Sequence, residues 1–240
     1  MIKLSYDLHI HSCLSPCGAE DMTPANIVNM AKLIGLEVIA VTDHNSCRNL
    51  PALDSYAKKN NIIAIFGMEL CTMEEVHVLC FFEALENAMS FDRYVYERLI
   101  KIANKKNIFG RQEIYNDEDI KIGEEANLLI NAADISFNNL DKLMKMYNGV
   151  YIPAHVDKGS NSLLSNLGFV PPDSEFECVE IHDIQKADEL CIMHPYFAKC
   201  NIITNSDAHT LVEINDSVNF LNVRERSSEA VLEALIHVQT

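Results

Sequence analysis

Positive charge is scarce in this sequence. Its 240 residues carry 19 Lys and Arg against 35 Asp and Glu, which gives a formal net charge of −16. A surface this acidic repels the phosphate backbone of nucleic acid, so we expect no tight binding of long duplex nucleic acid. Most of the negative charge is expected to keep the chain in solution.

Long apolar runs and a targeting leader are also lacking. The longest apolar runs, such as residues 62–66, are far shorter than the ~20 residues that a transmembrane helix needs. Residues 1–7 pass directly into a strand pattern, without the charged segment and apolar core of a signal peptide. We therefore expect no membrane contact and a cytoplasmic location, in which the cysteines stay reduced.

Strand and helix signals alternate over the first third of the chain. Thr23 is placed to cap a helix that has Pro24 at its first position and ends near Gly35. A second helix is predicted over residues 51–60. Apolar strands are predicted over residues 4–11, 37–41, 62–70 and 76–82. Repeated strand–helix units of this kind indicate a parallel sheet covered by helices.

The sequence changes character over residues 83–148. This stretch is rich in charge, has few strand signals and shows helical patterns over residues 94–104 and 140–147, so we predict a helical insert. Further strands are predicted over residues 150–155, 178–182 and 201–204, and residues 218–223 are a candidate for one more before a closing helix over residues 227–237. About seven strands in one domain, residues 1–240, favour an α/β barrel over an open doubly wound sheet.

Histidines and carboxylates recur at the ends of the predicted strands, where parallel barrels build their active sites. His9 and His11 stand two apart on one strand, so both side chains point to the same side. A single histidine at a strand end is more often structural than a ligand. Here, however, such side chains fall at or just beyond the carboxyl ends of successive strands: His9, His11, Asp43, His44, Glu69, His77, His155, Asp207 and His209.

The types of donor atom in this set indicate which metal ions it would bind. The sequence has no Cys-x-x-Cys pair, so imidazoles and carboxylates stand without paired thiolates. Such a set suits Zn²⁺, Mn²⁺ or Fe²⁺ in a catalytic rather than a structural site. The donors are too many for a single ion, so we predict two or three divalent ions.

Four motifs follow one another along the chain: His9-x-His11, Thr42-Asp43-His44-Asn45, Gly67-Met68-Glu69 and Ser206-Asp207-Ala208-His209. Together with His77 and His155, they resemble the motifs of the PHP (polymerase and histidinol phosphatase) domain phosphoesterases. The resemblance covers nearly the whole chain and is weakest over residues 83–148. It implies a distorted (β/α)7 TIM-like barrel with a trinuclear metal centre.

The resemblance also implies which residues hold each ion. The first ion would be held by His9, His11, Glu69 and Asp207. His44 and His209 would hold the second ion, and His77 and His155 the third, to which Glu69 would bridge. In the family, one more ligand to the second ion comes from the loop after the His-x-His pair. That loop, residues 12–22, departs here from the commonest spacing; Asp21 is the predicted ligand, with Glu20 and Cys17 as alternatives.

The predicted activity follows from the ions. Hydrolysis of a phosphate ester needs a nucleophile in line with the leaving group and positive charge near the phosphoryl oxygens; neighbouring ions supply the charge and a metal-activated hydroxide. We therefore predict a metal-dependent phosphoesterase. Asp43 is expected to orient a ligating histidine or to give the leaving group a proton. His182, at the end of the strand over residues 178–182, is a candidate for catalysis or phosphate binding.

The expected substrate is small. Arg48 and Lys158 are loop cations near the ligands, and either they bind a second phosphate or they are ordinary solvated charges. The insert is expected to leave the fourth strand beside His77 and to wall off the metal site. These features favour a small phosphorylated metabolite, a nucleotide or a short oligonucleotide as substrate, and no long duplex.

Two other functions stay open. Amidohydrolase barrels also begin with a His-x-His pair and end with an aspartate, and they use their ions to split a C–N bond. The Thr-Asp-His-Asn and Asp-x-His motifs fit the phosphoesterase pattern better. The second alternative is a non-catalytic metal-binding PHP module, which would lack ligands, whereas here only the loop ligand is unassigned.

Overall fold

The computed structural model describes residues 1–236 of the chain. The strands are β1 (Ile2–Ile10), β2 (Val38–Val41), β3 (Ile63–Cys71), β4 (His77–Phe82), β5 (Glu113–Tyr115), β6 (Lys121–Glu124), β7 (Gly149–Pro153), β8 (Cys178–Glu180), β9 (Asn201–Ile203) and β10 (Phe220–Val223). The α-helices are α1 (Pro24–Ile34), α2 (Leu50–Asn60), α3 (Leu85–Arg98), α4 (Lys106–Phe109), α5 (Leu140–Met146), α6 (Leu163–Leu167), α7 (Ala187–Met193) and α8 (Ser228–Ile236). No helix among residues 1–236 is long and apolar enough to cross a membrane.

Most predicted elements are present within a few residues of their expected bounds. Thr23 caps α1 by accepting a hydrogen bond from the backbone of Asn26, and Gly35 ends the helix in a left-handed conformation, with φ of 82°. The closing helix ends at Ile236 as far as the structure describes it. Its predicted last residue, His237, lies outside the described residues.

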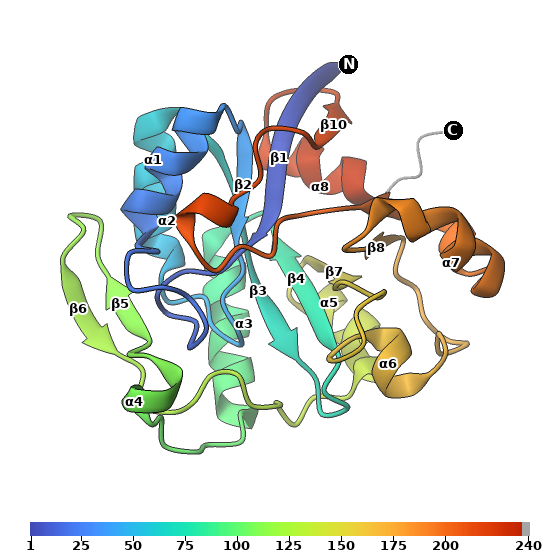
Figure 1. Cartoon of the computed structure of the whole chain (residues 1–240), viewed down its shortest axis with the longest axis horizontal. Coiled ribbons are helices and arrows are strands. Elements are labelled where there is room, and N and C mark those ends of the chain that lie inside the picture. Colours follow the sequence, from blue (N-terminus) through green and yellow to red (C-terminus); the bar gives the residue numbers. More distant parts are fainter. Residues whose placement is uncertain (237–240) are drawn as a thin grey trace.

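The main sheet has six strands in the order β10-β1-β2-β3-β4-β7, and it curls into half a barrel (Figure 1). Strands β1, β2 and β3 run parallel, as predicted, but β4 runs antiparallel to both β3 and β7. The prediction of a uniformly parallel sheet is therefore wrong at β10, which runs antiparallel to β1, and at β4. At β4 the cause is the connection from Cys71 to His77, which is too short for the crossover that a parallel neighbour requires.

Strands β8 and β9 form a separate parallel pair beside β7. The backbone N–H of Val156, just after β7, donates to the carbonyl of Glu180 at 3.0 Å. On the other side of the pair, the N–H of His11 donates to the carbonyl of Ala208 at 2.9 Å. The chain is thus an α/β fold in which several hydrogen bonds join the β8–β9 pair, and the loop that follows β9, to both sides of the curled sheet. On the β1 side they include Leu8 N–H to Oδ1 of Asn205 at 2.8 Å and Ala208 N–H to the carbonyl of His9 at 3.3 Å.

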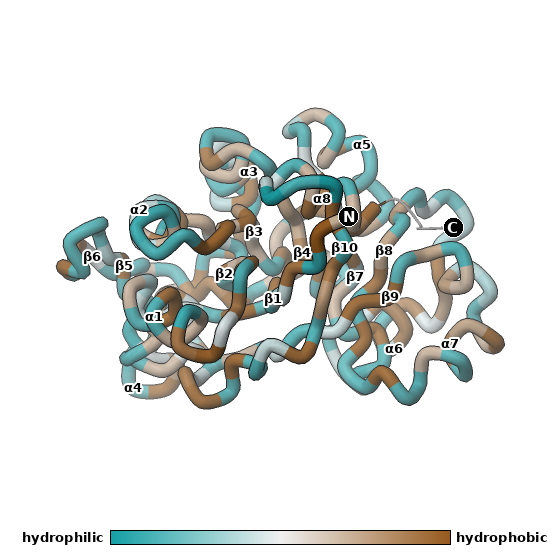
Figure 2. The backbone as a smooth tube through the Cα atoms, turned by 90° about the horizontal axis from the view of Figure 1, so that it is seen from above, coloured by the Kyte–Doolittle hydropathy of each residue, from teal (hydrophilic) through white to brown (hydrophobic). Residues whose placement is uncertain are grey.

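Apolar side chains pack on both faces of the main sheet. The outer face packs against the helices, for example Ile39 of β2 with Ile27 of α1. The inner face is filled by residues such as Leu4 and Phe81 and is plugged by Val231 of α8. Seen from above, hydrophobic residues concentrate on the central strands, and the periphery carries most of the hydrophilic colour (Figure 2). The polar residues described below lie next to this inner core, at one edge of the sheet.

A register shift in β1 changes which side chains face inward. The pairing of β1 with β2 shifts between Asp7 and Ile10, so that two residues of β1 lie opposite one of β2. Before the shift, Leu4 and Leu8 belong to the inner core, whereas after it Ile10 belongs to the outer core. A bulge of this kind reverses the alternation of the strand. It allows His9 and His11 to face inward.

Residues 83–148 differ from the predicted insert in two ways. The segment is mixed, because the hairpin β5–β6 accompanies its helices. It also leaves β4 at Phe82, the end of the strand opposite His77, so the expectation that it emerges beside His77 is wrong. Helix α3 then returns the chain toward the end of the sheet that carries His77. There the N–H of Ala133 donates to the carbonyl of Cys71, the residue paired with His77, at 2.9 Å.

Candidate metal centre

One carboxylate, Glu69 at the end of β3, lies at the centre of a buried group of histidines. Its Oε1 is 2.8 Å from Nδ1 of His77 and 3.0 Å from Nε2 of His155. Its Oε2 is 3.0 Å from Nδ1 of His44 and 3.4 Å from Nε2 of His11. The two oxygens of Glu69 thus face different histidines. This is the arrangement that a carboxylate needs in order to bridge two ions.

The reversed direction of β4 places His77 in this group. His77 is the first residue of β4, and not near a carboxyl end as the sequence pattern predicted. In the antiparallel ladder it lies opposite Cys71, the last residue of β3. The amino end of β4 therefore meets the carboxyl ends of the parallel strands at one edge of the sheet.

Asp207 and His209 close the group from the C-terminal part of the chain. Oδ1 of Asp207 lies 3.3 Å from Nε2 of His9 and 3.2 Å from Nε2 of His11. The rings of His209 and His11 stack with their centroids 4.5 Å apart. Asp207 and His155 both have positive φ, 53° and 31°, which is a sparsely populated conformation for such residues. Strain of this kind is concentrated at functional sites.

In both His9 and His11, Nδ1 is hydrogen-bonded to a neighbouring side chain and Nε2 is directed at the group around Glu69. Nδ1 of His9 lies 3.1 Å from both carboxylate oxygens of Glu180, so it carries the proton that it donates to them. Its Nε2 is buried and makes no hydrogen bond. Histidines that bind ions are held in this way, with the second nitrogen on a carboxylate.

Asp43 acts on His11 through a serine. Its carboxylate accepts hydrogen bonds from the hydroxyls and backbone N–H groups of Ser12 and Ser15, at 2.6–3.2 Å. Burial raises the pKa of Asp43, and these four hydrogen bonds oppose that rise. Because the Ser15 hydroxyl donates to Asp43, its oxygen accepts from Nδ1–H of His11, 3.0 Å away. His11 therefore presents its unprotonated Nε2 to the centre.

Sequence reasoning missed Glu180, Ser12 and Ser15. Glu180 is buried and also accepts hydrogen bonds from Nδ2 of Asn205, at 2.7 Å, and from the backbone of His155, at 2.9 Å. Its signal was a carboxylate inside the apolar run Cys178-Val-Glu-Ile181, where only a paired acid is tolerated. The neighbouring His182, which the strand pattern favours as a candidate, is exposed, and its backbone N–H donates to Asp157.

Burial and neighbouring charges shift the pKa values of the residues in this group in opposite directions. Burial opposes the ionisation of Glu69, but His77 and His9 hold its pKa well below the usual range. Burial likewise opposes protonation of His77, yet Glu69 raises its pKa to about 10. Burial lowers the pKa of His11 to about 3. Glu69 is thus a carboxylate and His11 a neutral imidazole, which are the forms that bind ions. Burial also opposes protonation of His9, but Glu180 and Asp207 raise its pKa, so protons on His9 and His77 have to leave on binding.

The donor atoms fall into overlapping groups within 4.8 Å of one another. The groups are His9, His11 and Glu69; His44, Glu69 and His77; and His11, Cys17, His44 and His209. Together with buried nitrogens of His9, His44 and His155 that make no hydrogen bond, these groups fit divalent transition ions. Neither Asp21 nor Glu20 belongs to these groups among the described residues, and both are exposed.

The donors line a cavity of about 200 Å³ that opens at the edge of the sheet. Lys158 lines it and forms an ion pair with Oδ2 of Asp207. Ile130, from the segment 83–148, lines it too. Nδ2 of Asn45 holds that part of the segment in place, donating to the carbonyls of Leu129 and Asn131 at 2.7 and 2.8 Å. The segment therefore forms part of the wall of this cavity.

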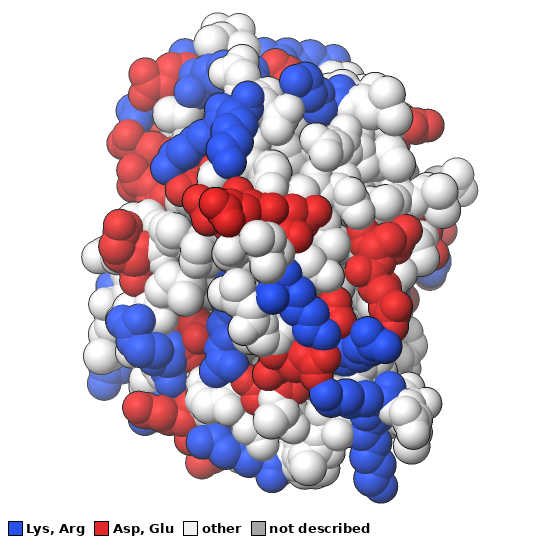
Figure 3. Space-filling view, turned by 90° about the vertical axis from the view of Figure 1, so that its left-hand side faces the viewer, with Lys and Arg blue, Asp and Glu red and all other residues white. Residues whose placement is uncertain are grey.

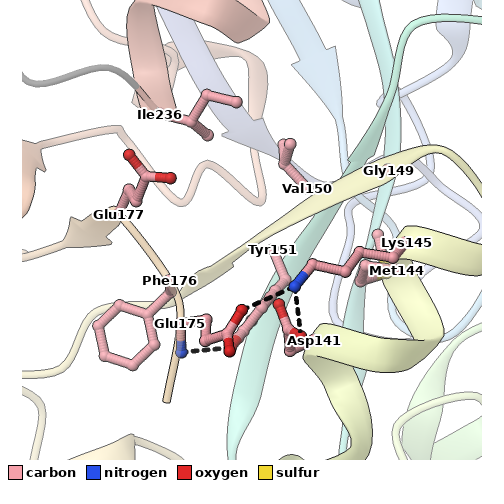
Figure 4. A pocket seen from close by; sticks show the side chains of 10 residues that line it. All are labelled: Asp141, Met144, Lys145, Gly149, Val150, Tyr151, Glu175, Phe176, Glu177 and Ile236. Atoms are coloured by element: carbon pink, nitrogen blue, oxygen red, sulfur yellow. Dashed lines mark hydrogen bonds and ion pairs between the residues drawn. The ribbon is translucent and has the colours of Figure 1, made fainter.

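A cavity of similar size, about 210 Å³, lies elsewhere and is lined by carboxylates and apolar side chains. It is found where β7 begins, at Gly149, whereas His155 follows the other end of that strand. Lys145 lies across it and contacts the carboxylates of Asp141 and Glu175 at 2.8 and 2.7 Å (Figure 4). No histidine is among the described residues that line it, unlike the first cavity.

Arg48 is directed away from the donors. Its guanidinium forms an ion pair with Glu125 and lies 4.4 Å from the ring centroid of Tyr96, both in the segment 83–148. The face that carries α2 and the β5–β6 hairpin shows Lys and Arg interspersed with Asp and Glu (Figure 3). That face therefore presents charges of both signs instead of a continuous basic surface.

Comparison with known proteins agrees with this geometry. The family model of the PHP domain matches residues 7–158. The uncharacterised protein YqxK of Bacillus subtilis (strain 168) is 27% identical over 259 residues, covering 93% of this chain and 59% of that protein. The uncharacterised protein MJ1587 of Methanocaldococcus jannaschii is 35% identical over 78 residues, 28% of this chain and 44% of that protein. The chain thus spans less than two thirds of the curated relatives that it matches.

Solved structures share the fold at low sequence identity. The lesion-specific endonuclease Q of Pyrococcus furiosus superposes with a TM-score of 0.69 and 20% identity, over 99% of this chain and 57% of that one. A proposed metal-dependent phosphoesterase of Bifidobacterium adolescentis gives 0.60 and 15%, and an amidohydrolase of Chromobacterium violaceum 0.61 and 16%, each over 97% of both chains. At such identities the likeness establishes the fold alone.

Proposed function

The chain belongs to the PHP domain family of metal-dependent hydrolases, and from that premise we propose that it hydrolyses phosphate esters. The observation that carries the proposal is the position of Glu69, with each carboxylate oxygen facing different histidines. A centre with one bridging carboxylate and six histidines holds more than one ion. Neighbouring ions supply a nucleophile at neutral pH and balance the charge that develops on phosphoryl oxygens.

The residues of this chain have separable tasks in the proposal. His9, His11, Glu69 and Asp207 would hold the first ion, His44 and His209 the second, and His77 and His155 the third. Asp43 positions His11 through Ser15 and does not itself face the cavity donors. Lys158 lies at the cavity wall and is paired with Asp207, and its ammonium group is the cation that would be available there to a phosphoryl oxygen of the substrate.

A small substrate or a short single strand fits the cavity best. Its volume of about 200 Å³ and its wall at Ile130 suit one phosphorylated group, not a double helix. The net charge of −16 also disfavours long duplex nucleic acid. Endonuclease Q is a structural neighbour that has been crystallised with a 27-mer duplex carrying an abasic lesion at its active site. A nuclease acting on damaged DNA is therefore the second candidate.

The proposal is tested by an activity screen of the full chain. The protein, stripped of metal and reloaded separately with Zn²⁺, Mn²⁺ or Fe²⁺, is offered phosphate monoesters, phosphate diesters, a short single-stranded oligonucleotide, a duplex with an abasic site and an N-acyl amide. We expect metal-dependent hydrolysis of the small esters or of the oligonucleotide. In the same assay Lys158→Ala should raise KM more than it lowers kcat, whereas Lys186→Ala should change neither.

Two results would contradict the proposal. Cleavage of the amide without cleavage of any ester would identify an amidohydrolase, the activity of the Chromobacterium violaceum neighbour. No turnover of any substrate by fully loaded protein would favour a non-catalytic module. Efficient cleavage of the duplex at physiological salt would leave a phosphoesterase but overturn the size limit.

A further inference from the structure

The loop that carries Cys17 is fixed against the histidine group. The N–H of Gly18 donates to the carbonyl of Ser15 at 3.0 Å, and the N–H of Ala19 donates to the carbonyl of His209 at 2.9 Å. A Cβ on Gly18 would clash with the carbonyl oxygen of Ser12, so this turn needs glycine for close packing. The position of Cys17 relative to His209 is thus set by the backbone.

Cys17 completes a four-membered group with three histidines. Its sulfur and one nitrogen each of His11, His44 and His209 all lie within 4.8 Å of one another. Independently of the cysteine, three imidazole rings gather here, because the ring centroid of His11 lies 4.6 Å from that of His44 and 4.5 Å from that of His209. The side chain of His44 is only 5% exposed, so this imidazole is largely sheltered from bulk water.

The other candidates from the same loop face elsewhere. Glu20 lies 3.7 Å from the guanidinium of Arg111, and among the described residues Asp21 belongs to none of the donor groups, whereas the exposed Cys17 does. The nearby thiols of Cys13 and Cys47 are buried and donate weak hydrogen bonds to the carbonyls of Glu113 and Gly67, at 3.8 and 3.5 Å. Among the loop residues that the sequence offered as ligands, only the thiol of Cys17 faces the histidines.

We propose that the thiolate of Cys17 is the loop ligand of the second ion, beside His44 and His209, and that it gives this position a preference for Zn²⁺ over Mn²⁺. Thiolate and imidazole together suit Zn²⁺, whereas Mn²⁺ prefers oxygen donors. Binding deprotonates the thiol outright, so one proton leaves as the ion enters. The inference rests on the metal dependence of the family and not on the substrate class.

Cobalt provides a direct probe of this ligand. The full chain, stripped of metal, is titrated with Co²⁺, and its near-ultraviolet spectrum is recorded. We expect a thiolate-to-cobalt charge-transfer band in the wild type that is absent in Cys17→Ser, together with the loss of about one equivalent of tightly bound ion. Cys191→Ser, which changes a half-buried cysteine outside the histidine groups, should keep both the band and the ion.

A carboxylate variant separates the role of the ligand from the stability of the loop. Cys17→Asp should keep the ion and lose the band, and in competition experiments it should bind Mn²⁺ relative to Zn²⁺ at least tenfold better than the wild type does. Retention of the band and of all bound ions in Cys17→Ser would overturn the proposal. So would the loss of one ion in Asp21→Ala but not in Cys17→Ser. None of these measurements depends on catalytic activity, so the inference can fail or hold separately from the proposed function.

Discussion

At the scale of single residues, Glu180 does more than orient one ligand. Three donors converge on its carboxylate: Nδ1–H of His9, Nδ2–H of Asn205 and the backbone N–H of His155. His9 is thereby held in the tautomer that leaves Nε2 free, and His155 is held at its unusual φ of 31°. One buried carboxylate therefore positions ligands from two distant parts of the chain.

We predict that Glu180→Gln weakens metal binding. The side-chain amide has a single acceptor oxygen, so in either orientation its NH₂ group faces one of the three donors. The affinity for Zn²⁺, measured by competition with a chelating dye, should fall about 10–100-fold. Glu180→Asp should recover part of the loss, and Glu177→Gln, an exposed glutamate three residues earlier, should bind as the wild type does. Unchanged affinity in Glu180→Gln would show that the carboxylate has no part in positioning.

At the scale of elements, the sequence located most strands but not their direction or phase. The reversal of β4 was readable, because residues 72–76 are too few for a crossover helix. The bulge in β1 was not readable, because Leu8 and His9 look like an ordinary alternating pair and only the partner strand reveals the shift. The candidate ligands could be predicted from the sequence without knowing the direction of β4 or the bulge in β1, because His, Asp and Glu at strand ends differ from the apolar residues around them. Glu180 was overlooked because its partners lie far away in sequence.

The β3–β4 hairpin supplies Glu69 and His77, and its packing leaves no space for a larger side chain at Gly67. Gly67 lies opposite Phe81 in the ladder, and a Cβ there would lie 2.5 Å from the carbonyl oxygen of Cys80 and 2.6 Å from the Phe81 ring. We predict that Gly67→Ala destabilises the fold by about 1–3 kcal/mol, or roughly 2–4 °C in Tm for each kcal/mol.

The matched control for Gly67→Ala is another strand glycine. A Cβ on Gly123 of β6 would meet no atom within 4 Å, so Gly123→Ala should stay within about 0.5 kcal/mol of the wild type. Both variants are compared by thermal and chemical denaturation. Equal stability of the two would mean that the hairpin can shift to accept a methyl group at Gly67.

At the scale of the whole molecule, the ions would add a connection between segments that lie far apart in the sequence. Hydrogen bonds already attach the β8–β9 pair and the following loop to the main sheet, and the cluster adds to them by drawing on Asp207 after β9 as well as on His9 and Glu69 of the main sheet. Ligands bound only by the folded state stabilise it by mass action. The closure of the half barrel is therefore expected to depend on the ions.

We predict that chelation lowers the thermal stability of the full chain and that Zn²⁺ restores it. With free ion at 1,000 times Kd, one site contributes about 4 kcal/mol, which corresponds to a Tm change of roughly 10 °C for a chain of this length. Glu69→Gln, which removes the bridging charge, should respond to the chelator much less. A Tm that is the same with and without chelator in the wild type would show that the fold closes without ions.

The spacing of the ligands along the chain also fixes an order of events in time. The first donors, His9 and His11, are synthesised some 200 residues before Asp207 and His209. No partly synthesised chain that ends before Asp207 and His209 can assemble the complete set of donors. The complete set therefore forms only after strands β1 to β9 have been synthesised.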